Sequence, residues 1–266
     1  MLEILGYTSA LFIGVVLGLI GGGGSILAVP VLAYLFSVDE KVATAYSLFI
    51  VGTSALVGGL KKHKKGLVDW RTAFVFGIPA ILGISFVRHF VVPALPDVLF
   101  SVASFQFTRR MAMFGLFSVL MIPAALSMLQ NKKLEVNASP TAYNYSLIVT
   151  QGISIGIITG MIGAGGGFLI IPALVLLARV EMKVAVATSL IIIAMNALSG
   201  FFLGDALTMT IDWRFLLTFT AISLVGIFVG SYLGNFIDGK KLKRGFGYFI
   251  FVMAIFIFVM EFFVAR

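Results

Sequence analysis

The sequence contains one unit twice. Residues 18–58 align with residues 160–200 at a constant offset of 142 without a gap, and 20 of the 41 aligned positions are identical. The tripeptide Asp-Trp-Arg at 69–71 returns at 212–214. A duplication of this length predicts two halves with the same order of elements. We therefore divide the chain into a first repeat (1–130), a linker (131–142) and a second repeat (143–266).

The apolar content excludes a soluble domain. Apolar side chains make up 60% of the 266 residues, charged residues 11%, and the mean hydropathy is +1.11. Soluble domains carry about 25% charged residues, so this chain has too few to cover a soluble surface. This excludes a soluble enzyme, a nucleic-acid-binding domain and a disordered chain. The net charge of +8 is then expected to mark cytoplasmic loops of a membrane protein.

Each repeat contains four apolar segments, which predicts an all-α polytopic membrane protein. A membrane-spanning helix needs about 20 residues, and the last three segments of each repeat have that length. The first segments are about 33 residues, or roughly 50 Å as a helix, and each is interrupted by small residues that we expect to break it. The segments cover 4–36, 42–60, 72–92 and 110–129, then 145–178, 184–203, 214–236 and 246–264. The interruptions are Gly21, Gly22, Gly23, Gly24 and Ser25 in the first repeat, and Gly163, Ala164, Gly165, Gly166 and Gly167 in the second.

The basic residues favour a topology in which both broken segments are re-entrant. If each one returns to its starting side, each repeat crosses three times and the two repeats are inverted. One face then collects 13 of the 19 Lys and Arg residues, including 61–65 and 240–244. If all eight segments cross, the split is 9 to 10 and defines no orientation. Because basic loops favour the cytoplasm, we expect a cytoplasmic linker, with both termini outside the cell membrane.

The two interruptions predict an anion site. A short helix is expected after each one, at 26–36 and 168–178, and its first N–H groups have no partner within the helix. The N-terminal end of a helix also carries a partial positive charge. Two such ends, brought together near the middle of the membrane, would bind an anion through the main chain. The alternative is that the glycines serve only close helix packing.

Polar residues on the second segment of each repeat support this interpretation. Ser47 and Ser54 share one helical face, as do their counterparts Ser189 and Asn196. They would line the pocket and orient the oxygens of the anion, as would Gln151 before the second interruption. The alternative for the serines is interhelical hydrogen bonding, whereas an amide inside a membrane span is unfavourable without a partner.

Acidic and metal-binding chemistry is not expected inside the membrane. All eleven Asp and Glu residues fall near segment ends or in loops, so no carboxylate is placed as a proton relay or a cation site. The sequence has no cysteine, and its two histidines are isolated, so we expect neither a metal site nor a cofactor. No nucleophile–base pair indicates an enzyme. Eleven extra residues between 88 and 110 would form an interfacial helix or an oligomer contact, such as that of a homodimer.

The two interruptions and the segments after them resemble the signatures of the TauE/SafE family of sulfite and organosulfonate exporters. The resemblance extends over nearly the whole chain. It implies an inner-membrane permease for small sulfur oxyanions or sulfonates, which most members export. Gly22 is matched by Ala164 and Ser25 by Gly167, so the two interruptions are not equivalent. The matching motifs are GLIGGGGSILAVP at 18–30, GMIGAGGGFLIIP at 160–172, ATAYSL at 43–48 and AVATSL at 185–190.

These observations lead to one functional hypothesis with two alternatives. The hypothesis is a secondary transporter that binds a small anion between the two interruptions and exports it by alternating access. The alternatives are an anion channel on the same scaffold and a membrane accessory protein that transports nothing. The expected partners are the anion and membrane lipid, with no nucleic acid.

Overall fold

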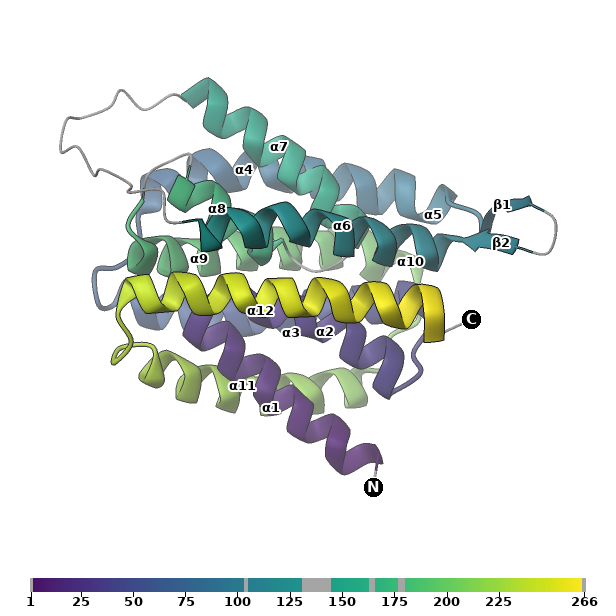
Figure 1. Cartoon of the computed structure of the whole chain (residues 1–266), viewed down its shortest axis with the longest axis horizontal. Coiled ribbons are helices and arrows are strands. Elements are labelled where there is room, and N and C mark those ends of the chain that lie inside the picture. Colours follow the sequence, from purple (N-terminus) through teal and green to yellow (C-terminus); the bar gives the residue numbers. More distant parts are fainter. Residues whose placement is uncertain (1, 103–104, 131–144, 163–165, 177–179, 265–266) are drawn as a thin grey trace.

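The computed structural model describes residues 2–102, 105–130, 145–162, 166–176 and 180–264. Its helices form an elongated bundle in which α1 and α7 lie on opposite sides (Figure 1). Six helical stretches are long and apolar enough to cross a membrane, three from each repeat, which confirms the all-α polytopic prediction. They are Glu40–His63, Trp70–Ala94, Arg109–Leu129, Met182–Thr208, Trp213–Leu233 and Gly239–Val264.

These six stretches consist of α-helices, three of which are extended by π-helical turns. In the first repeat they are α3 (Glu40–His63), α4 (Trp70–Phe86) with a π-turn at Val87–Val91 and α5 (Val92–Ala94), and α6 (Arg109–Leu129). In the second they are α9 (Met182–Gly200) with a π-turn at Phe201–Asp205 and α10 (Ala206–Thr208), α11 (Trp213–Leu233), and α12 (Gly239–Val259) with a π-turn at Met260–Val264.

The first apolar segment of each repeat is divided, as predicted. In the first repeat α1 (Leu2–Ile20) ends before Gly21 and Gly22, and α2 (Gly23–Pro30) follows with a π-turn at Val31–Leu35. In the second repeat α7 (Tyr145–Ile162) precedes α8 (Gly167–Leu176). Gly163, Ala164 and Gly165 lie outside the described residues.

The start of α2 corrects one prediction, because Gly23, Gly24 and Ser25 are helical although the sequence suggested a start at Ile26. The reason is tertiary packing. A Cβ on Gly24 would lie 2.5 Å from the carbonyl oxygen of Ile13, so the absence of a side chain lets α2 lie directly against α1. Packing of this kind outweighs a weak intrinsic helix propensity.

Helix packing follows the duplication. α1 packs along α11 and α7 packs along α4, which are equivalent pairs in the two repeats, while α3 packs on α9 and α6 on α12. In Figure 1, α1 and α7 run in opposite directions along the bundle. The re-entrant, inverted relation of the two repeats stays a prediction.

Glycines allow α1 and α11 to pack with their backbones in contact. A Cβ on Gly230 would lie 2.0 Å from the carbonyl oxygen of Val15. We therefore expect Gly230→Ala to push the helices apart and lower the free energy of unfolding by about 1–3 kcal/mol. The control is Gly245→Ala, since a Cβ there would meet nothing within 4 Å. Thermal unfolding of the two purified variants measures the difference, and equal midpoints would contradict the importance of this contact.

Aspartates fix the starts of three spans. Asp39 accepts a hydrogen bond from the N–H of Lys41, Asp69 from that of Thr72, and Asp212 from that of Phe215. The Asp of each Asp-Trp-Arg tripeptide therefore lies at a helix start.

The extra residues of the first repeat form a hairpin that extends from one end of the bundle (Figure 1). Strands β1 (Val98–Val102) and β2 (Phe105–Thr108) pair antiparallel. The expectation of an interfacial helix is therefore wrong for these strands. Backbone pairing between two short runs rich in Phe and Val satisfies their N–H and C=O groups without a helix.

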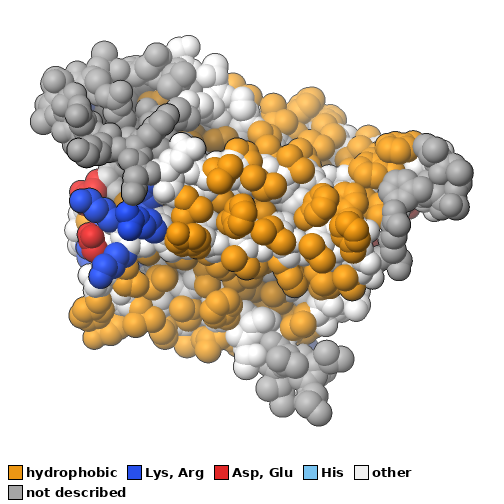
Figure 2. All heavy atoms as spheres, viewed as in Figure 1, with side chains coloured by type: hydrophobic (Ala, Val, Ile, Leu, Met, Phe, Trp, Pro, Cys, Tyr) orange, Lys and Arg blue, Asp and Glu red, His pale blue; other side chains and the backbone are white. Residues whose placement is uncertain are grey.

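The lateral surface of the bundle is apolar, whereas Lys and Arg gather at the end where α12 begins (Figure 2). Exposed side chains such as Leu82, Ile78 and Val252 point outward from α4 and α12. In a soluble protein such a surface would be unfavourable, but it fits a lipid environment. The basic end contains Lys65, whose ammonium donates to the side-chain oxygen of Asn235 at 3.1 Å.

Candidate functional site

The two interruptions meet inside the bundle, as the sequence predicted. A Cβ built on Gly22 would lie 2.2 Å from the carbonyl oxygen of Gly167, and one on Gly167 would lie 2.4 Å from the Cα of Gly22. The backbones of the two repeats are therefore in direct contact at this point. Gly21 has φ +88° and Gly166 has φ +79°, in the left-handed region that glycine adopts without strain. In this conformation Gly22 and Gly167 leave no room for an anion between them.

One face of α9 runs along this contact. The hydroxyl oxygen of Ser189 lies 3.1 Å from a Cβ built on Gly21, and the Cδ1 of Ile193 lies 2.7 Å from one on Gly167. Asn196 follows Ile193 by three residues and so lies on the same side of the helix. The Ser189 hydroxyl donates to the carbonyl oxygen of Val186 at 3.0 Å. The structure thus brings Ser189 to the first interruption and places Asn196 one turn beyond the second.

Two of the predicted polar residues are buried without a hydrogen-bond partner among the described residues. Asn196 is 0% exposed, and neither its amide nitrogen nor its amide oxygen is bonded. The hydroxyl of Ser47, at the equivalent of Ser189 on α3, is likewise buried and unbonded. An unsatisfied buried polar group destabilises a protein by about 1–3 kcal/mol. Their retention at this place fits side chains whose partner is a ligand.

The other predicted residues are placed differently. The hydroxyls of Ser54 and Ser223 lie 3.1 Å apart, which is the interhelical bond that the sequence left as an alternative. Gln151 lies on α7, eleven residues before its last residue, Ile162, about 16 Å along the helix axis. Roles for Ser54 and Gln151 in binding stay predictions.

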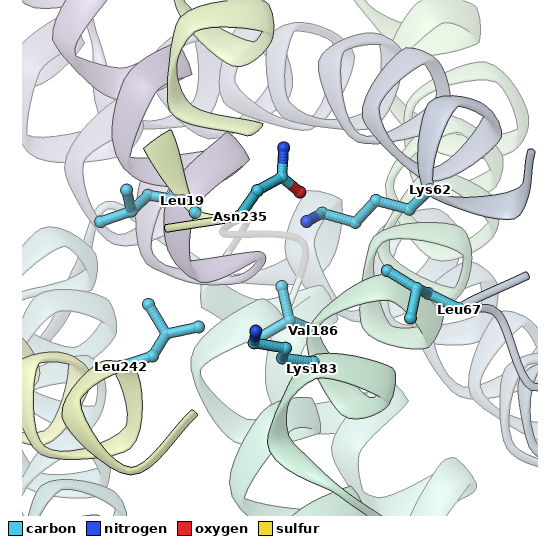
Figure 3. A pocket seen from close by; sticks show the side chains of 8 residues that line it. Leu19, Lys62, Leu67, Lys183, Val186, Asn235 and Leu242 are labelled. Atoms are coloured by element: carbon cyan, nitrogen blue, oxygen red, sulfur yellow. The ribbon is translucent and has the colours of Figure 1, made fainter. Parts of the chain in front are cut away.

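A pocket of about 180 Å³ opens at the basic end of the bundle (Figure 3). Lys62 reaches it from the last turn of α3 and Lys183 from the first turn of α9. The sequence indicated both lysines only as basic residues near segment ends. The duplication could not predict that these lysines meet, because Lys62 and Lys183 are not at equivalent positions of the two repeats. The lining residues are Leu19, Lys62, Leu67, Lys183, Val186, Gly234, Asn235 and Leu242.

Ion pairs of arginine lie at the opposite end, and the pair of Arg88 with Asp205 is buried. The guanidinium of Arg88 donates to both carboxylate oxygens of Asp205, at 3.1 and 3.2 Å, and to the hydroxyl of Thr44 at 3.2 Å. Arg109 pairs with Glu40 and, at 2.7 Å, with Asp97. The sequence placed these residues near segment ends but did not indicate that Arg88 and Asp205 pair.

The two ends therefore differ in what they offer an anion. At the end with Arg88 an ion pair joins the two repeats, because Arg88 belongs to the first repeat and Asp205 to the second. The end with Lys62 has a pocket that is lined by two lysines and no carboxylate, whereas a pocket of about 360 Å³ at the start of α11 is lined by both Arg214 and Asp212. Among the described residues, no group of three or more His, Asp or Glu is arranged to hold a metal ion.

The comparisons with known proteins agree with a membrane transporter. The family model described as "Sulfite exporter TauE/SafE" matches residues 7–257. A probable membrane transporter protein of Xylella fastidiosa (strain 9a5c) is 29% identical over 255 residues, which cover 92% of this chain and 90% of that protein. The probable membrane transporter protein YunE of Bacillus subtilis (strain 168) is 30% identical over 258 residues, 88% of each chain. No solved structure matches the chain significantly.

Proposed function

The chain belongs to the sulfite exporter TauE/SafE family, and from this premise we propose that it exports small sulfur-containing anions across the inner membrane. Sulfite and two-carbon organosulfonates are the substrates that we expect. The protein is a multi-pass membrane transporter, and we propose that it works by alternating access.

The observation that carries this proposal is the meeting of the interruptions beside an unpartnered amide. Gly22 and Gly167 are in backbone contact, and the unbonded side chain of Asn196 lies one turn beyond that contact. The N–H groups at the starts of α2 and α8 lack partners within their helices, and both starts lie at the contact. If the two repeats separate slightly here, the anion meets N–H donors at the starts of α2 and α8, with Ser47, Ser189 and Asn196 beside them.

The proposed cycle uses the difference between the two ends. In the conformation described, the anion enters from the basic end while the pair of Arg88 with Asp205 holds the other end together. Occupation of the interruptions by the anion favours a state in which that pair separates and the other end opens. A ligand shifts such an equilibrium only if its affinity for the two states differs. Here the difference would come from backbone N–H donors that reach the anion only when the contact between Gly22 and Gly167 opens.

Export agrees with the charge of the substrate. Moving one negative charge out of a cell with a negative interior is favoured by about 2.3 kcal/mol per 100 mV. An exporter of anions therefore needs no coupling carboxylate inside the membrane.

The proposal is tested by counterflow in proteoliposomes. Vesicles with the protein and unlabelled internal sulfite should accumulate external radiolabelled sulfite transiently, and the rate should saturate. A channel on the same scaffold would show currents and no counterflow. An accessory protein would give no flux beyond that of empty vesicles for sulfite, taurine or isethionate. Either of these results overturns the proposed carrier.

The buried amide gives a prediction in which stability and transport change in opposite directions. Asn196→Leu removes an unsatisfied polar group, so we expect the free energy of unfolding to rise by about 1–3 kcal/mol. Sulfite flux should fall at least tenfold, because the anion loses a hydrogen-bond donor. The control is Thr220→Val, since the buried Thr220 hydroxyl is already bonded to the carbonyl oxygen of Leu216. Reduced stability of Asn196→Leu with normal flux would make Asn196 a packing residue.

A further inference from the structure

The pocket at the basic end brings together cationic groups from different parts of the chain. Figure 3 shows the ammonium of Lys62 extending from α3 toward Asn235, with Lys183 reaching the pocket from α9 beside Val186. The other lining residues are apolar or glycine, and no carboxylate is among them. The pocket thus offers hydrogen-bond donors and positive charge inside an apolar wall.

Lys62 is held in this pocket against an electrostatic penalty. Lys62 is only 8% exposed. Among the described residues, no side chain accepts a hydrogen bond from the ammonium of Lys62 or of Lys183. The charges that act on the Lys62 ammonium are those of Lys61, Lys65 and Lys183, which repel it. An ammonium group with little access to solvent and no opposite charge beside it is unfavourable. A bound anion between Lys62 and Lys183 would remove both the repulsion and the lack of partners.

The wall of the pocket is shared with the first interruption. Val186 lines the pocket, and its carbonyl oxygen and Cγ1 each lie 3.0 Å from a Cβ built on Gly21. Leu19, which also lines the pocket, precedes Gly21 by two residues. An anion between the lysines is thus separated from the first interruption by a single layer of side chains.

We infer that the pocket between Lys62 and Lys183 binds a small oxyanion, and that this is where the substrate docks before it reaches the interruptions. The docking role rests on the proposed function, whereas the anion site itself does not. Two ammonium groups suit a compact anion that carries its charge on several oxygens, such as sulfite, sulfate or the head of a sulfonate. Asn235 adds an amide to the same site.

The test is calorimetric titration of sulfite into protein purified in detergent. Lys62→Gln and Lys183→Gln should each weaken binding by about ten- to hundredfold, as expected for the loss of one hydrogen bond to a charged group. The double variant should show no measurable binding. Lys64→Gln is the matched control, because Lys64 lies in the same basic run, is exposed and does not line the pocket. It changes the net charge equally and should alter the affinity less than twofold.

Thermal unfolding separates binding from a structural role. If the lysines stabilise the fold, Lys62→Gln should lower the midpoint of the ligand-free protein, and this would overturn the inference. If they serve the anion, the ligand-free midpoint should stay or rise, and the increase on adding sulfite should be lost. Lys183→Arg, which retains a cation, should keep most of that increase.

The outcomes also distinguish this inference from the proposed function. If the unaltered protein transports sulfite in proteoliposomes but Lys62→Gln and Lys183→Gln bind sulfite normally, the docking pocket is overturned and the proposed transporter stands. Lysine-dependent binding without flux by the unaltered protein would overturn the transporter and leave the anion site.

A lipid phosphate presents the same kind of oxygens, so the titration is repeated in nanodiscs. Equal sulfite affinity in phosphatidylcholine alone and with added phosphatidylglycerol supports a site for the free anion. Loss of sulfite binding as phosphatidylglycerol is added would assign the pocket to a lipid headgroup and overturn the docking role.

Discussion

Gly22→Val is expected to abolish sulfite flux while the six spans still insert. A single Cβ at Gly22 would already lie 2.2 Å from the carbonyl oxygen and 2.3 Å from the carbonyl carbon of Gly167. Backbone atoms cannot turn aside as a flexible side chain does, so the starts of α2 and α8 must move apart. A displacement of about 1 Å in a positioned site reduces rates by roughly a hundredfold, and the valine requires more than this.

The matched control for this variant is Gly245→Val on the exposed first part of α12. A Cβ there meets nothing within 4 Å, so we expect normal flux. Insertion of both variants is checked by the yield of monodisperse protein and by labelling of a single introduced cysteine, which is feasible because the chain has none. Normal flux in Gly22→Val, with insertion confirmed, would remove the interruptions from the mechanism.

Arg88→Met is expected to lower the free energy of unfolding more than Gly230→Ala does. Arg88 is 1% exposed and Asp205 is 3% exposed, so the substitution leaves a buried carboxylate without its cation. Removing one partner of a buried ion pair costs about 3–5 kcal/mol. Thermal or denaturant unfolding of the purified protein measures this loss.

The double variant Arg88→Met/Asp205→Leu is the control for the ion pair. Because both charges are removed, we expect most of the lost stability to return, since apolar replacements of a buried pair are often neutral or better. Under the proposed cycle the double variant should still change transport. The ion pair that separates when this end opens is lost, and an apolar contact takes its place. A double variant that is as unstable as Arg88→Met would show that Arg88 acts through packing alone.

The sequence predicted the spans from local patterns and the meeting of the two interruptions from the duplication. Segment length and apolar content give the helices, and the offset of 142 gives equivalent places for the glycines. The exact start of α2 was missed, since the helical state of Gly24 depends on its contact with Ile13 in another helix. Intrinsic propensity alone carries no such information.

The charged ends were harder to predict than the interruptions. Arg88 and Asp205 are 117 residues apart and occupy positions that the duplication does not relate, so no pattern in the chain pairs them. The same holds for Lys62 and Lys183, which meet only because the end of α3 lies beside the start of α9. A sign that the sequence did contain is the cluster of four lysines at 61–65, which has no acidic residue among them. The hairpin at β1 and β2 was missed because a run rich in Phe and Val, between two spans, also fits an interfacial helix.

The central claim is that main-chain amides at the paired interruptions bind the substrate anion. The most direct test is a structure determined with selenite, which has the shape and charge of sulfite and whose selenium is located by its anomalous scattering. We predict a selenium peak beside Asn196, placed so that the selenite oxygens accept hydrogen bonds from N–H groups at the starts of α2 and α8. A peak at Lys62 and Lys183 alone, with Gly22 and Gly167 still in contact in every state that the protein adopts with selenite, would contradict the account.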